Sequence, residues 1–178
     1  MDLQTALRNL SLLEGGFTVD NGGATECGIT QEAWDAYSDK LGICRSPVRS
    51  ITPTEEEDFY RESYWGPLLC DQLEALQEGL GFVLFQWALN HEGAGDRGGA
   101  VMSLQVCCGI PPDGVMGTET LKAVAQVYDK RRLMACILGR QEGWYQEAAT
   151  KNPALPLDGW ERRVRKTREI VGLTQASV

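Results

Sequence analysis

The chain has 178 residues, 43% of them hydrophobic and 24% charged, with a formal net charge of −8 at pH 7. Such a composition predicts a folded protein with one compact core, or one core with an appendage, and excludes a chain that is disordered by composition. The negative charge argues against non-specific binding to nucleic acid, which needs a basic surface. No apolar stretch approaches the ~20 residues of a membrane span, so we expect no membrane-spanning segment.

The first predicted element is an amphipathic helix that ends beside a carboxylate. Its apolar residues recur at steps of three and four, typical of one helical face: Leu3, Ala6, Leu7, Leu10 and Leu13. Gly15-Gly16 favours a helix end. Glu14 would then sit at the helix C-terminus, where the negative end of the macrodipole and the apolar neighbours favour a raised pKa. A carboxyl group kept protonated in this way can serve as a general acid; the alternative is that Glu14 is only an exposed residue at a frayed helix end.

A β-hairpin is predicted next. Phe17 and Val19 alternate with polar residues, and Asn21-Gly22 is a strong signal for a tight turn. Asp20 would lie at this turn and Thr25 on the returning strand, where a hydroxyl could hold a water or a substrate hydroxyl. Two carboxylates on neighbouring elements are what glycoside hydrolysis needs. The alternative for Asp20 is ordinary turn chemistry, because aspartate caps turns through its own side chain.

The rest of the chain is predicted to be helical. Thr30 favours the start of a helix that Gly42 ends, and the capping box at 52–55 favours a second helix toward Tyr64. Residues 81–90 are apolar nearly all round, which is typical of a helix in the middle of a core. Further helices are expected at 99–108, 118–128, 130–149 and 158–171, with turns at 93–99 and 111–114. The predicted fold class is mainly α with a small N-terminal β-hairpin.

Six cysteines and a single histidine limit the possible chemistry. No pair of cysteines is spaced as Cys-X-X-Cys, so a zinc site is not expected. Cys107 and Cys108 are adjacent in an apolar helix and are predicted to be small core residues. We expect all six as reduced thiols, with no required disulfide. A Cys–His nucleophile pair using His91 is conceivable, but no flanking motif favours it.

One basic cluster lies near the C-terminus and contains Arg162, Arg163, Arg165, Lys166 and Arg168. We interpret it as a solvated helix face, since cations are favoured near a helix C-terminus. The alternative is a contact with anionic wall polymer or with outer-membrane phosphate.

Together these motifs resemble those of glycoside hydrolase family 108, N-acetylmuramidases with a lysozyme-like fold found in phage endolysins and some bacterial proteins. The resemblance begins with three segments: Glu14-Gly15-Gly16-Phe17, residues 20–25 and residues 28–31. It continues in Tyr60, Tyr64-Trp65-Gly66-Pro67, residues 85–90 and Leu104-Gln105. Residues 113–121 and the ending Gly159-Trp160 with Arg162-Arg163 resemble the family's companion peptidoglycan-binding region.

The resemblance implies a catalytic set and a substrate. Glu14 is implied as the catalytic acid, Asp20 as base or electrostatic stabiliser, and Thr25 as the residue that positions water. Three further residues are implied to bind substrate: Thr30, Trp65 and Asn90. The partner would be the glycan strands of peptidoglycan, cut at the β-1,4 bond between N-acetylmuramic acid and N-acetylglucosamine without a metal or organic cofactor. Residues 1–92 would form the muramidase region, and 93–178 a helical region of the peptidoglycan-binding kind packed into the same body.

Delivery and alternative functions follow from the N-terminus and the charge. Residues 1–4 lack the basic and long apolar regions of a secretory signal. We expect a monomer made in the cytoplasm without a signal peptide, which acts on the cell wall in the periplasm after holin-dependent release or delivery by a secretion machine. Two alternatives stay open: a secreted antibacterial effector with an immunity partner, and a catalytically weak wall-binding module of the same fold.

Overall fold

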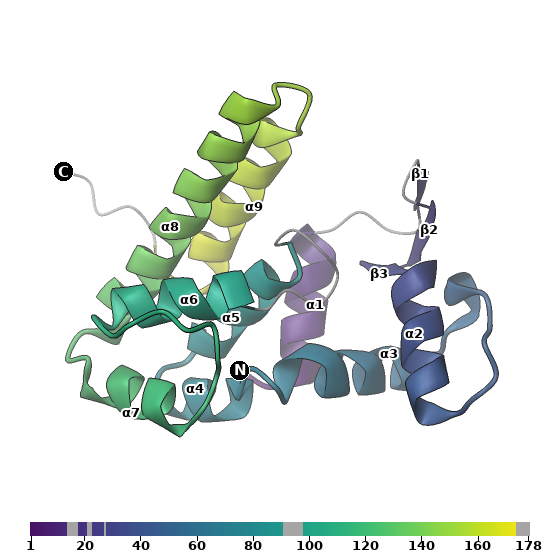
Figure 1. Ribbon diagram of the computed structural model, residues 1–178, viewed down its shortest axis with the longest axis horizontal. Coiled ribbons are helices and arrows are strands. Elements are labelled where there is room, and N and C mark those ends of the chain that lie inside the picture. The colour runs from purple at the N-terminus through teal and green to yellow at the C-terminus, as the bar shows by residue number, and fades with distance from the viewer. Residues whose placement is uncertain (14–17, 21–22, 27, 91–97, 174–178) are drawn as a thin grey trace.

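The computed structural model describes residues 1–13, 18–20, 23–26, 28–90 and 98–173, and for 18–20, 23–26 and 98 it describes only the backbone. The fold is mainly α, as predicted (Figure 1). The helices are α1 (Leu3–Leu13), α2 (Gln31–Leu41), α3 (Pro53–Tyr60), α4 (Cys70–Leu76), α5 (Leu80–Ala88), α6 (Gly98–Cys107), α7 (Thr118–Gln126), α8 (Lys130–Lys151) and α9 (Leu157–Ile170). A 3₁₀ turn spans Val48–Ser50 and a π-helix spans Arg61–Trp65. In the part of the chain that the structure describes, no helix is long and apolar enough to cross a membrane.

The N-terminal strands form a three-stranded antiparallel sheet rather than the predicted hairpin alone. β1 (Thr18–Asp20) pairs with β2 (Gly23–Glu26), and β2 pairs with β3 (Ile29–Thr30). The register places Asp20 opposite Gly23, and the predicted turn Asn21-Gly22 between them lies outside the described residues. β3 is too short to show an alternating pattern in the sequence, which is why only the hairpin could be predicted.

Local sequence signals account for the ends of the next helices. The Thr30 hydroxyl accepts a hydrogen bond from the Ala33 N–H, and Gly42 ends α2 with a left-handed backbone at φ 67°. Thr52 and Glu55 form the predicted reciprocal capping box of α3. The chain stays helical beyond α3 because the π-helix continues it as far as Trp65.

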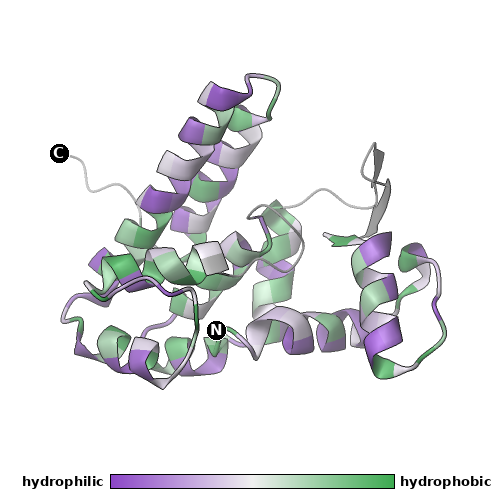
Figure 2. Cartoon of the chain, in the orientation of Figure 1, coloured by the Kyte–Doolittle hydropathy of each residue, from purple (hydrophilic) through white to green (hydrophobic). Residues whose placement is uncertain are grey.

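The central helix of the core is α5. All of its residues are buried, and α4, α6 and α8 pack against it, as expected for a helix that is apolar on every side. Gly81 permits a close approach between α4 and α5, since a Cβ there would lie 2.7 Å from the Cys70 carbonyl oxygen. Figure 2 shows the contrast between the strongly hydrophobic ribbon around α5 and α6 and the more hydrophilic α8 and α9.

The helices α8 and α9 form a long antiparallel pair that rises from this core (Figure 1). The rings of Tyr145 and Trp160 stack with 4.7 Å between their centroids, and Trp144 lies 6.1 Å from Trp160. Arg163, one turn further along α9, is buried. The Gly-Trp-X-X-Arg segment therefore packs α9 onto α8, and the basic cluster is not solvated throughout.

A disulfide joins α6 to α8, which contradicts the prediction of six reduced thiols. Cys107 and Cys136 are bonded across a sequence separation of 29 residues. The prediction was wrong because spacing along the chain does not reveal that two helices lie side by side. Among the described cysteines, Cys44, Cys70 and Cys108 are free.

The two predicted regions, 1–92 and 93–178, share extensive contacts. α5 of the first region contacts α6 and α8 of the second, and α1 contacts α9. A buried side-chain hydrogen bond crosses the same boundary, from Gln86 to Gln141 at 2.8 Å. The second region therefore completes the core of the first.

Candidate active site

The predicted acid follows directly on α1. Ala6 and Leu10 bury one face of this helix, which the structure describes as far as Leu13, so the predicted helix is confirmed. Its predicted end at Gly15-Gly16 lies outside the described residues. Glu14 is the next residue of the chain and lies outside the described residues. Its role as acid stays a prediction from the sequence.

The backbone of the sheet brings three threonines together. Thr25 lies in the central strand β2, opposite Thr18 of β1 and Thr30 of β3. Asp20 is the last residue of β1. The structure describes only the backbone of Asp20 and Thr25, so their catalytic roles also stay predictions.

Thr30 has a structural role that the sequence indicated. Its hydroxyl oxygen accepts the Ala33 N–H at 3.1 Å and so caps α2. The side chain is half-buried, and a substrate contact would have to share this hydroxyl with the cap.

Trp65 is a core residue, which contradicts its assignment to substrate binding. Its side chain is 0% exposed, and its indole N–H donates to the Asp71 carboxylate at 2.7 Å. Its ring also packs edge-on against Phe85, with 5.5 Å between centroids. A ring enclosed in this way presents no face to a sugar.

Asn90 lies two residues past the end of α5, next to a buried hydrogen-bond network that contains the side-chain amides of Gln86 and Gln141. Its side-chain N–H donates to the Gln86 carbonyl oxygen at 3.1 Å. The Gln86 amide donates to Gln141 of α8 at 2.8 Å, and Gln141 donates to the Tyr145 hydroxyl at 2.8 Å. Gln141 was missed by sequence reasoning, because nothing in a helical pattern singles out one buried amide. The network connects α5 to α8, and Asn90 bonds to the backbone of Gln86, whose side chain is one of its members.

Several hollows lie on the surface of the described residues, and two of them are described here. One, of about 590 Å³, lies between α2 and the π-helix and is lined by Tyr37, Phe59, Glu62 and Tyr64 among others. Burial, the charges of Glu62 and Asp58 and a hydrogen bond with Glu62 raise the pKa of Tyr37.

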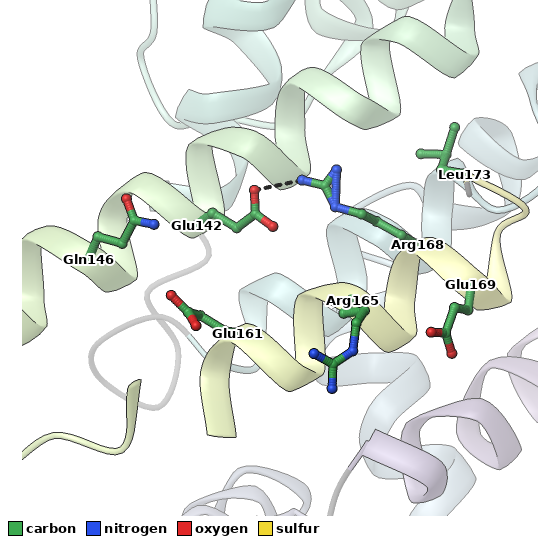
Figure 3. Close-up of a pocket in the computed structure, with 7 residues that line it drawn as sticks. All are labelled: Glu142, Gln146, Glu161, Arg165, Arg168, Glu169 and Leu173. Carbon is green, nitrogen blue, oxygen red and sulfur yellow. Dashed lines mark hydrogen bonds and ion pairs between the residues drawn. The ribbon is translucent and has the colours of Figure 1, made fainter. Parts of the chain in front are cut away.

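The second hollow, of about 420 Å³, lies between α8 and α9 (Figure 3). It is lined by charges of both signs, and Arg168 donates to Glu142 across it at 2.6 Å. Within the described residues no group of three or more histidine, cysteine, aspartate or glutamate side chains could hold a metal ion. The polar and charged side chains that line this second hollow can make hydrogen bonds and ion pairs.

Comparison with known proteins finds a family similarity in the N-terminal part of the chain. The family described as glycosyl hydrolase 108 matches residues 7–92, a range that contains most of α1, the sheet and the chain through α5. The whole chain is similar to a solved structure, that of Brucella abortus SagA, with 26% sequence identity and a TM-score of 0.72 over 98% of this chain and 96% of that chain. No curated protein matches the sequence significantly. These similarities support a glycoside hydrolase with a lysozyme-like fold.

Proposed function

We propose that this protein is a peptidoglycan hydrolase that cleaves the β-1,4 bond between N-acetylmuramic acid and N-acetylglucosamine, with Glu14 as the general acid. The observation that carries the proposal is the family match over residues 7–92. That range holds the end of α1, where Glu14 follows, and the sheet that contains Asp20 and Thr25. The matched range therefore contains the predicted acid and both of its predicted partners.

In the proposed reaction Glu14 gives its proton to the leaving glycosidic oxygen. Asp20 acts as base or stabilises the positive charge that develops on the sugar, and Thr25 positions the attacking water. The two carboxyl groups act without a metal or organic cofactor. Asn90 and Thr30 are the proposed contacts to the glycan outside the reacting bond.

The test is a digest of purified peptidoglycan, reduced with borohydride and analysed by mass spectrometry. The proposed reaction leaves reduced N-acetylmuramic acid at every new end. Reduced N-acetylglucosamine at the new ends would contradict the proposed bond. Binding to the insoluble wall without release of soluble products would favour the wall-binding module.

The same digest tests the second half of the catalytic set. Asp20→Asn should slow release by about 10²-fold if the carboxylate acts in catalysis, whereas a turn cap would tolerate asparagine. Thr25→Ala should also slow release, and Thr25→Ser, which keeps the hydroxyl, is its matched control. Wild-type rates in both Asp20→Asn and Thr25→Ala would place the partners of Glu14 elsewhere.

We propose the periplasm as the place of action. The Cys107–Cys136 disulfide supports this, because such bonds persist in oxidising compartments. The proposed partners are the glycan strands, met by a monomer after holin-dependent release or secretion, with an immunity protein if the protein is an effector.

A further inference from the structure

The hollow between α2 and the π-helix, of about 590 Å³, combines an aromatic floor with a charged rim. Three rings that pack against one another make the floor. Tyr37 and Phe59 meet edge-on with 5.2 Å between their centroids, and the Phe59 ring lies 6.2 Å from that of Tyr64. The two tyrosines are 6% and 8% exposed, so part of each stays open to the hollow that they line. Such a floor can hold the aliphatic part of a ligand.

Two helical segments form the walls of this hollow. The residues of α2 that line it at positions i, i+3, i+4 and i+7 share one face of the helix: Ala33, Ala36, Tyr37 and Lys40. The alanines keep this wall open, because each has only a methyl group. The opposite wall is the π-helix, which contributes Glu62, and π-helical turns are rare and frequent at functional sites.

The rim carries two carboxylates and one ammonium, those of Glu32, Glu62 and Lys40. The Tyr37 hydroxyl donates to the Glu62 carboxylate, which keeps further sites to accept hydrogen bonds. Within the described residues, no salt bridge uses any of the three charged groups. The groove between α8 and α9 differs, because an arginine and a glutamate already pair across it (Figure 3). The charges around this hollow can therefore bind a ligand without breaking an ion pair of the protein.

We propose that the hollow binds the zwitterionic end of a diamino acid in the peptide stems that the glycan strands of peptidoglycan carry. The ammonium of that end contacts Glu62, its carboxylate contacts Lys40, and its aliphatic chain lies on the aromatic floor. Lys40 follows Tyr37 by three positions on the same helical face, and Tyr37 bonds Glu62, so the opposite charges flank one ring. A neutral sugar would leave both charges unmatched. The proposal rests on the function proposed above and makes peptide-bearing glycan the preferred substrate.

The test is a titration of the full-length protein with the free tripeptide alanyl-γ-glutamyl-diaminopimelate, measured by calorimetry and by backbone amide shifts in NMR spectra. Acetylation of the distal amine of the tripeptide removes the ammonium without any change in the protein. Glu62→Gln and Lys40→Met remove the two protein charges. Their matched controls are Glu119→Gln and Lys122→Met, at an exposed pair on α7. A melting temperature for each variant shows that it is folded.

We expect wild type to bind the tripeptide, with shift changes centred on residues 32–40 and 59–67. Acetylation and Glu62→Gln should each weaken binding by about 10-fold, as expected for a charged hydrogen bond. The two together should weaken binding no further, because both remove the same contact. Lys40→Met should weaken it by a similar factor, and the two controls should match wild type.

Equal binding of the acetylated and the free tripeptide by wild type would overturn the proposal, and so would no binding of either. Wild-type affinity in Glu62→Gln, or shift changes centred on other segments, would overturn it as well. Tighter binding of a bare N-acetylglucosamine oligomer in the hollow would assign the hollow to sugar instead. Failure of the proposed function is a distinct result, because the titration needs no cleavage and the peptidoglycan digest measures cleavage alone.

Discussion

Gln105 shows how one buried side chain shapes a whole turn. It is 1% exposed, and its amide N–H groups donate to the Asp113 carboxylate at 2.6 Å and the Thr120 hydroxyl at 3.0 Å. Its amide oxygen accepts the Gly114 N–H at 2.9 Å. The Leu-Gln and Asp-Gly segments, separate motifs in the sequence, thus form one hydrogen-bonded unit. Their contacts are those of a structural turn.

Asp113 makes this turn sensitive to acid. Hydrogen bonds from the Val115 N–H and the Gln105 amide hold its pKa below the ordinary value of 3.8. A carboxyl with a lowered pKa in the folded state stabilises the protein above that ordinary value, and the contribution is lost as the pH falls through the lowered pKa. We therefore expect Asp113→Asn to melt below wild type near pH 7, with a gap that closes below pH 3.8. Thermal melts of both proteins between pH 7 and pH 2 measure the gap, and a gap that does not change with pH would contradict this role.

Residue types alone did not separate binding residues from packing residues. Trp65 was predicted to bind substrate and is enclosed in the core, because the burial of an aromatic ring depends on helices that are distant in sequence. Thr30 was predicted both as a helix cap and as a substrate contact. The cap is confirmed, since capping is a local interaction. The substrate contact stays a prediction.

At the scale of elements, local signals predicted most helices well. The helices with caps or long apolar patterns lie close to their predicted ranges, as α2, α3 and α5 show. α4 was missed because it is short and begins after Leu69. This leucine has a positive φ of 54°, which nothing in the sequence predicts. The π-helix was missed because no characteristic residue marks the change from the hydrogen bonds of an α-helix to the wider ones of a π-helix.

The Cys107–Cys136 disulfide, which joins α6 to α8, should contribute measurably to the stability of the protein. Closing a loop across 29 residues restricts the unfolded chain, so Cys136→Ser should cost about 3–4 kcal/mol of unfolding free energy. Denaturant unfolding of Cys136→Ser against wild type measures this, with Cys44→Ser at an exposed free thiol as the control. Burial raises the pKa of the neighbouring Cys108 to about 11, so exchange with that thiol is disfavoured near neutral pH.

Alkylation of the unfolded chain gives an independent check on the same bond. Cys107 and Cys136 should be modified only after reduction. Modification of both without reductant, together with wild-type stability in Cys136→Ser, would restore the original prediction of reduced thiols.

At the scale of the whole molecule, the two halves of the chain depend on each other. The family match ends at residue 92, yet α5 packs against α6 and α8 from beyond that point, and α9 reaches back to α1. The mainly α fold could be predicted from periodicity and caps. Contacts such as Gln86–Gln141 and Lys166–Leu12 could not, because they join residues far apart in sequence through tertiary packing.

The central claim is that Glu14 supplies the proton for cleavage of the glycan. The most direct test is the initial rate at which new reducing ends appear when purified peptidoglycan is digested by wild type and by Glu14→Gln, with Glu78→Gln at an exposed surface position as the control. Glutamine keeps the size of the side chain and cannot donate the proton, so the rate should fall by about 10²- to 10⁴-fold while the melting temperature stays near wild type. Near wild-type release by Glu14→Gln would contradict the claim.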